Sequence, residues 1–174
     1  MFKHLNFSRG QSVKGFQRKF WWWSEDHRGV PGAPGRVVNL IKSEEKDKVW
    51  GVAYEIDEAT WTSKVMQHLD HREKGGYSRH NVIFYPRDQH QGLSMAGVEV
   101  TVYVGEQSHR QFAGPASLEE MASTILHSVG PSGKNVEYLY NLSTALREID
   151  PTDDHVFELE EAVKKMEAAN KTPS

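Results

Sequence analysis

The stretch Leu-Asp-His-Arg-Glu-Lys-Gly-Gly-Tyr, residues 69 to 77, stands where a helical pattern ends and a strand pattern begins. Glu73 is followed closely by Gly75 and Gly76, which let the backbone turn sharply and let a ligand come close. A carboxylate held at such a junction can act as a general base. An ordinary solvated glutamate in a turn has the same surroundings, so this stretch alone leaves both interpretations open.

The bulk composition narrows the class of protein. A chain of 174 residues suggests one domain with an added tail. A net charge of -3 argues against a broad nucleic-acid-binding face, because phosphate binding needs concentrated positive charge. The absence of cysteine excludes disulfides, thiolate metal sites and a cysteine nucleophile. No apolar run approaches a membrane span and no signal core is seen at the N-terminus, so the cytosol is the expected location.

The residues before the junction predict strands around a long loop. Asp26 to Arg36 holds several glycines and prolines, which exclude helix and central strand. We expect either a functional lid or a plain connection there. Asp57 can cap a helix that runs to about His71, with Trp61, Val65 and Leu69 as its buried stripe. Strands are predicted at residues 16–22, 37–41, 49–56, 81–85 and 98–104.

The second half of the chain is predicted to be helical. Ser117 and Glu120 have the spacing of a capping box. Further helices are expected from Asn135 to Ile149 and from about Asp153 to Ala169. Because strands come first and helices follow, we predict an α+β domain whose sheet curls toward a small mixed β-barrel flanked by helices.

Three other chemistries are conceivable but less well supported by spacing. His68 and His71 could share a helix face in a metal site, although no further ligand is fixed by the sequence. The Gly130 to Gly133 turn before Lys134 has only part of a phosphate-binding loop. The aromatic run from Trp21 to Trp23 could stack on bases, but core and rim packing is the favoured explanation, because aromatic side chains mainly supply buried area. A carboxylate base is therefore the simplest active site that this chain could build.

Ordered blocks of residues then point to a known family. The blocks are Asp26 to Arg36 with Val37-Val38, Val49 to Tyr54, Arg72 to Tyr77, Phe84-Tyr85-Pro86, Gly114-Pro115-Ala116, and Gly130 to Gly133 before Glu137-Tyr138-Leu139. In this order and at this spacing, they closely resemble the ChaC-type γ-glutamylcyclotransferases over roughly residues 13 to 150.

The resemblance implies a γ-glutamylcyclotransferase-like fold and cleavage of glutathione to 5-oxoproline and cysteinylglycine, without cofactor or metal. It implies that Glu73 is the catalytic base and acid, a role that suits a carboxylate whose pKa is raised by burial. Arg28 and Tyr103 match family positions near the active site. Arg28 could meet a substrate carboxylate or brace its own loop. Tyr103 could donate to the glutamyl group or fill the barrel.

The chain departs from the family pattern at its start. Family members begin with a strand that ends in a Tyr-Gly-Ser-Leu turn, whose backbone N–H groups hold the glutamyl group, and residues 1 to 12 carry no such turn. We expect an atypical segment over 1–12, the cyclotransferase-like domain over 13–150, and a helix and tail over 151–174. Two functions stay open: an active glutathione-specific enzyme, or a catalytically impaired relative that acts as a binding or interaction protein.

Overall fold

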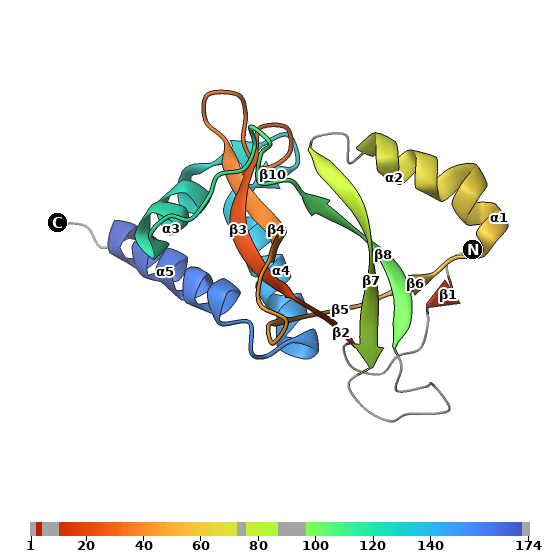
Figure 1. The fold of residues 1–174 in the computed structure, drawn as a ribbon. Helices are drawn as coiled ribbons and strands as arrows, with labels where there is room; N and C mark the ends of the chain where they lie inside the picture. Colours follow the sequence, from red (N-terminus) through yellow and green to blue (C-terminus); the bar gives the residue numbers. More distant parts are fainter. Residues whose placement is uncertain (1–2, 5–10, 73–75, 87–96, 172–174) are drawn as a thin grey trace.

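The computed structural model describes residues 3–4, 11–72, 76–86 and 97–171. Strands occupy the middle of the molecule, between the helices of the second half of the chain and the helical segment over residues 58–72 (Figure 1). None of the described helices combines the length and the apolar character that a bilayer span requires. The strands are β1 (Lys3–His4), β2 (Gln11–Lys14), β3 (Phe16–Ser24), β4 (Gly35–Lys42), β5 (Lys48–Gly51), β6 (Tyr54–Glu55), β7 (Tyr77–Pro86), β8 (Val98–Gly105), β9 (Val129–Gly130) and β10 (Gly133–Lys134). The helices are α1 (Glu58–Thr60), the π-helical turn η1 (Trp61–Val65), α2 (Met66–Arg72), α3 (Leu118–His127), α4 (Asn135–Ile149) and α5 (Asp154–Lys171).

A long bent hairpin links the two main sheets. Its outer part pairs β3 with β4, and its inner part pairs β2 with β5, both antiparallel. Gly15 lies at the bend with φ of 77°, in the left-handed region that favours glycine. Its amide donates to the Asp47 carbonyl at 2.9 Å and its carbonyl accepts from Ser43 at 2.9 Å, so the bend is itself hydrogen-bonded.

The inner part of the hairpin belongs to a four-stranded antiparallel sheet of order β5-β2-β7-β8. Its last strand meets β4 through a side chain. The Asn39 amide donates to the Gly105 carbonyl at 3.0 Å and accepts from the Gly105 amide at 2.9 Å. The predicted α+β class is confirmed, while the backbone pairings among the described strands do not close a barrel. Where β4 meets β8, the buried side chain of Asn39 makes the hydrogen bonds that backbone pairing makes between the other neighbouring strands.

Several strand boundaries differ from the sequence prediction. β7 begins at Tyr77, not Asn81, because β8 pairs with it over its first residues as well. The strand predicted over 49–56 is split into β5 and β6. Within the patternless first twelve residues, β1 pairs with β6, and β2 begins at Gln11 between β5 and β7. These strands do not pair beside β3, whose described partner is β4.

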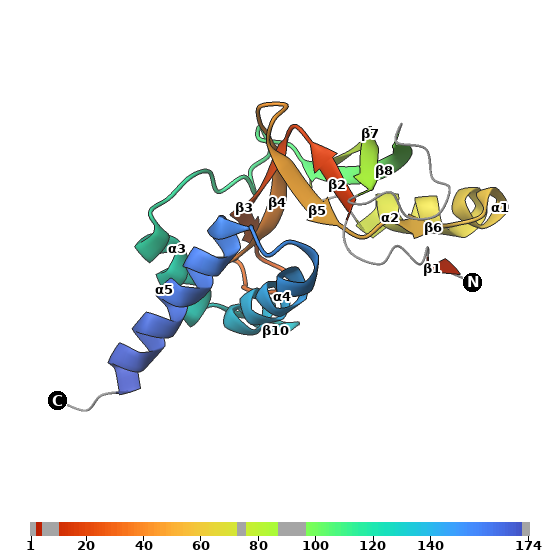
Figure 2. The ribbon, with the colours of Figure 1, turned by 90° about the horizontal axis from the view of Figure 1, so that it is seen from below.

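The helical segment before the junction is predicted well. Asp57 caps α1, accepting from the Thr60 amide at 2.9 Å, and the segment continues through η1 to the end of α2. Its expected apolar stripe is only half-buried at Trp61, Val65 and Leu69. This segment therefore lies on the side of the sheet instead of forming part of a closed core, as Figures 1 and 2 show.

Two hydrophobic cores lie on the two parts of the hairpin. The sheet core gathers Val13, Phe16, Val49, Phe84 and Val104. The larger core lies between β3 and the helical layer of α3, α4 and α5, which Figure 2 shows below the hairpin. It contains Phe20, Met121, Ala122, Ile125, Val136, Leu139, Leu146, Val156, Leu159 and Val163. The closing helix is thus part of the core: Val156, Leu159 and Val163 are fully buried, and Met166, which shares their helical spacing, is half-buried.

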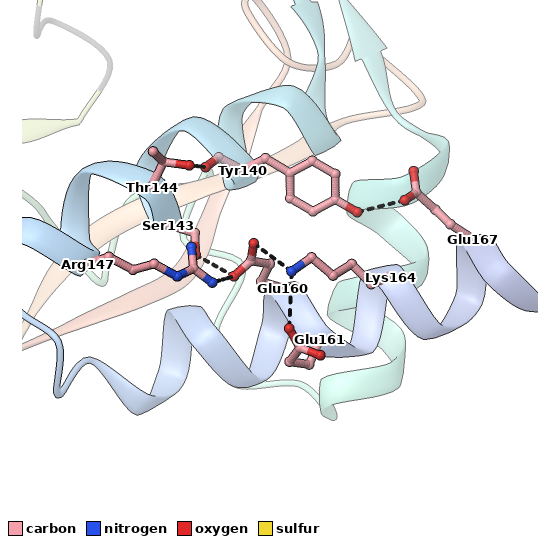
Figure 3. Close-up of polar contacts among 8 residues, drawn as sticks. All are labelled: Tyr140, Ser143, Thr144, Arg147, Glu160, Glu161, Lys164 and Glu167. Carbon is pink, nitrogen blue, oxygen red and sulfur yellow. Dashed lines mark hydrogen bonds and ion pairs between the residues drawn. The ribbon is translucent and has the colours of Figure 1, made fainter.

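A buried carboxylate joins α4 to α5 (Figure 3). Glu160 is 5% exposed and accepts from the Ser143 hydroxyl at 2.6 Å, from Lys164 at 3.0 Å, and from Arg147. Burial alone would raise the pKa of Glu160, but these hydrogen bonds outweigh it and hold the pKa below its ordinary value. The ionised carboxylate is therefore satisfied inside the helical layer.

Candidate active site

The junction that carries Glu73 lies between a helix and a strand, as predicted. α2 ends at Arg72 and β7 begins at Tyr77. Glu73 itself lies outside the described residues. Beyond it, Gly76 has φ of 94°, and a Cβ placed there would lie 2.2 Å from the His109 ring. The carbonyl of Gly76 accepts from the Glu106 amide at 2.8 Å. Glycine is thus required at position 76 both by backbone conformation and by the close approach of His109.

Tyr103 is held by the end of α2. Its hydroxyl donates to Asp70 Oδ1 at 2.6 Å, and Asp70 Oδ2 lies 3.7 Å from Arg79 Nη1. Arg79 stands directly opposite Tyr103 in the pairing of β7 with β8. Burial, together with the hydrogen bond to Asp70, raises the pKa of Tyr103 to about 12. Because a phenol has one proton, this hydroxyl offers only its lone pairs to any other partner.

Asp70 is a residue that the sequence analysis did not single out. A signal was present, since Asp70 precedes Glu73 by three positions, about one helical turn. Its partner on β8 could not be identified, because the two residues are 33 positions apart in the chain.

Arg28 is held by a different part of the molecule. Its Nη1 donates to the Lys134 carbonyl at 3.2 Å, and its guanidinium lies 5.6 Å from the centre of the Tyr138 ring. Its backbone amide donates to the Ser24 hydroxyl at 3.0 Å. The loop-bracing role that the sequence left open is therefore observed, while contact with a substrate stays a prediction. Arg28 and Tyr103 are each fixed by their own partners.

The loop around Arg28 packs tightly against the turn between β9 and β10. A Cβ at Gly130 would lie 2.2 Å from the His27 carbonyl oxygen, which also accepts from the Ser132 amide at 2.9 Å. The glycine-rich turn that partly resembled a phosphate loop thus supports the neighbouring loop through its backbone. This close packing explains why glycine is needed at position 130.

Arg36, predicted as the far end of the loop, lies within β4. Its side chain is buried, donates from Nη1 to the Phe20 carbonyl at 3.0 Å, and lies 4.4 Å from the Trp23 ring centre. Its backbone amide and carbonyl both bond to the side chain of Asn135, at 2.7 Å and 2.8 Å. The loop is therefore closed at this end by α4, and the chain returns to regular strand one residue before Arg36.

The structure also bears on the tryptophan run and on the histidine pair that the sequence offered as candidate sites. Trp22 is 2% exposed and packs against Tyr77 and His109, with ring centres 4.9 Å and 5.6 Å away. The aromatic run is thus core at this position. His68 and His71 both lie on α2. Over the part of the chain that the structure describes, no group of three or more His, Asp or Glu side chains could hold a metal ion.

Comparison with known proteins bears on the whole chain. The family model described as ChaC-like protein matches residues 3–166. A relative from Schizosaccharomyces pombe, named glutathione-specific γ-glutamylcyclotransferase, is 38% identical over 93% of this chain and 85% of its own length. Glutathione-specific γ-glutamylcyclotransferase 1 of Danio rerio is 39% identical over 87% of this chain and 76% of its own. A yeast γ-glutamyl cyclotransferase crystal structure, titled as specific to glutathione, superposes with a TM-score of 0.78 at 28% identity, covering 90% of this chain and 87% of that one.

The fold and the junction thus define a γ-glutamylcyclotransferase-like α+β protein. Within that class, the chain belongs to the ChaC-like family. The resemblance found from the ordered sequence blocks is confirmed, and the matched region extends beyond residues 13–150 on both sides.

Proposed function

We propose that this chain degrades glutathione, releasing 5-oxoproline and cysteinylglycine. The observation that carries the proposal is the likeness, over most of the chain, to family members whose names state that they are specific for glutathione. The Arg-Glu-Lys-Gly-Gly-Tyr block, which includes Glu73, stands at the helix-to-strand turn.

The chemistry needs no nucleophile from the protein. The lone pair of the substrate's α-amine attacks its own γ-carbonyl carbon, a new C–N bond closes the five-membered ring, and the amide bond to cysteine breaks. The attacking amine loses one proton and the departing amine gains one. A single carboxylate can carry that proton between them, and we assign this role to Glu73. Holding the amine against the carbonyl supplies further acceleration through orientation.

Two more residues are proposed near the substrate. Arg28 carries a charge suited to a carboxylate of glutathione, and its present partner, a backbone carbonyl, leaves further guanidinium donors for a ligand. Tyr103 is proposed to contact the glutamyl group. Because its proton is donated to Asp70, the Tyr103 hydroxyl can meet the substrate only as an acceptor.

The second candidate function is a catalytically impaired family member that binds glutathione weakly or binds another protein. It is favoured by the missing Tyr-Gly-Ser-Leu turn within residues 1–12. β2, which begins at Gln11, has a partner strand on each side, so this part of the sheet is paired despite the departure. The two functions differ in what they predict for the intact protein.

Incubation of the purified chain with glutathione separates them. The enzyme proposal predicts that 5-oxoproline and cysteinylglycine appear in equal amounts while glutathione disappears, measured by mass spectrometry. No product, combined with measurable glutathione binding by calorimetry, would establish the impaired alternative. Glutamate released in place of 5-oxoproline would mean hydrolysis and would contradict the cyclisation chemistry.

We also infer a domain division and a location. The division keeps 13–150 as the catalytic domain and 151–174 as a helix and tail, and α5 packs into the same core as α3 and α4. The cytosol is proposed because a chain without cysteine needs no oxidising compartment. Fractionation of cells that express the full chain would test the location.

A further inference from the structure

The end of α2, directly before Glu73 in the chain, is tied to the sheet by a polar cluster of Asp70, Arg79 and Tyr103. Asp70 lies in the last turn of α2 and accepts the Tyr103 hydrogen bond at 2.6 Å. Its second oxygen faces Arg79 at 3.7 Å. Because Arg79 and Tyr103 are cross-strand neighbours on β7 and β8, one carboxylate contacts both strands at the same level. The end of α2 is thereby linked to the two strands that follow it in the chain.

The C-terminal side is fixed independently. The Gly76 carbonyl accepts from Glu106, and the His109 ring packs directly over Gly76. His109 in turn stacks on Trp22, which is buried. The stretch 73–75 is therefore bracketed by two attachments that use different parts of the protein. The attachment through Asp70 depends on its hydrogen bond with Tyr103 and on the facing charge of Arg79.

We propose that Asp70 is a positioning residue for catalysis, which fixes the C-terminal end of α2 on the sheet through Tyr103, directly before the proposed base Glu73 in the chain. This inference rests on the proposed function and deepens it, since it assigns Tyr103 a structural partner as well as a place near the substrate. Small displacements of a catalytic group cost large factors in rate, whereas substrate affinity depends on groups that touch the substrate. Loss of the Asp70 contact is thus expected to lower kcat and to leave KM nearly unchanged.

A double-mutant cycle tests the hydrogen bond between Asp70 and Tyr103. Asp70→Ala and Tyr103→Phe each remove the hydrogen bond. We expect Asp70→Ala to lower kcat by about tenfold and Tyr103→Phe, which also loses its proposed contact with the substrate, by at least as much, with the double variant no worse than Tyr103→Phe alone. Asp70→Asn retains an oxygen that accepts from Tyr103, so it should recover most of the rate. The matched control is Tyr140→Phe, which removes the tyrosine–carboxylate hydrogen bond to Glu167 (2.7 Å) in the helical layer (Figure 3) and should leave kcat unchanged.

A second measurement does not depend on turnover. Hydrogen exchange of the peptide spanning 70–77 should be at least about tenfold faster in Asp70→Ala and in Tyr103→Phe than in the wild type, and unchanged in Tyr140→Phe. Unchanged exchange in all variants would overturn the inference, whatever the activity. A raised KM confined to Tyr103→Phe, with Asp70→Ala kinetically normal, would also overturn it and leave Tyr103 as a substrate ligand only. A wild type that yields no 5-oxoproline would refute the proposed function, while the exchange result would still decide whether Asp70 fixes the junction.

Discussion

His155 makes the stability of the fold depend on pH in a definite window. It lies in the first turns of α5, and its Nε2 accepts from the buried Phe20 amide of β3 at 3.0 Å. Accepting at Nε2 requires a neutral ring with its proton on Nδ1. Burial, aided by the nearby charge of Lys19, lowers the pKa of His155 to about 4 from 6.5.

The direction of this pH dependence follows from proton binding by the folded and the unfolded chain. Between pH 6.5 and 4 the unfolded chain binds a proton at His155 that the folded chain does not, so acid favours unfolding there. The contribution of His155 to stability is complete above pH 6.5 and is lost as the pH falls through this window. A difference of about 2.5 pKa units corresponds to roughly 3 kcal/mol, at a slope of up to about 1.4 kcal/mol per pH unit.

Urea unfolding followed by the fluorescence of the five tryptophans measures this effect. The free energy of unfolding is determined at several values between pH 7.5 and 4, for the wild type and for His155→Gln, which keeps an acceptor but does not titrate. The wild type should lose about 2 to 3 kcal/mol more than the variant across the window. The exposed His127, replaced by glutamine, serves as control and should follow the wild type. Parallel losses in the wild type and His155→Gln would refute the reasoning.

Two further predictions concern stability and the junction. Glu160→Ala removes the acceptor shared by Ser143, Arg147 and Lys164. Because the two cations are half-exposed and can be hydrated, we expect the free energy of unfolding, measured with urea, to fall by about 2 kcal/mol, less than for a fully buried pair. A fall under about 0.5 kcal/mol would contradict the role assigned to Glu160. Gly76→Ala meets both the positive φ and the His109 ring, so we expect a loss of roughly 2 to 3 kcal/mol by the same method; Gly51→Ala, where a Cβ meets open space, is the control and should lose less than half as much.

Local signals explain most of what the sequence predicted about the fold. The Asp57 cap and the capping box of Ser117 and Glu120 are determined by residues three positions apart, and both are present. The inward faces of α3, α4 and α5 follow from helical periodicity alone. Strand ends were predicted less well. β7 begins at Tyr77 among polar residues, where pairing with β8, not the alternation of side chains, maintains the strand.

Contacts between distant residues could not be predicted from one sequence. Asn39 joins β4 to Gly105 of β8, and no local pattern marks an asparagine within an apolar strand as the element that bridges two sheets. Arg36 was assigned to a loop because it follows glycine and proline, whereas its buried contacts place it in β4.

The candidate site shows the same division between local and distant information. The residues alone made Glu73 only one possible carboxylate base, and its proposed role rests on the resemblance of the surrounding blocks to a family. The partner of Tyr103 depends on how α2 lies against β8, which is a property of the folded chain.

The central claim is that Glu73 carries the proton in a cyclisation of glutathione. The most direct measurement is the rate of 5-oxoproline release at saturating glutathione by the wild type and by Glu73→Gln, with Glu58→Gln at the far end of the same helical segment as control. We predict that Glu73→Gln lowers kcat by at least about 100-fold, while Glu58→Gln has the kcat of the wild type. Equal release by the wild type and Glu73→Gln would contradict it.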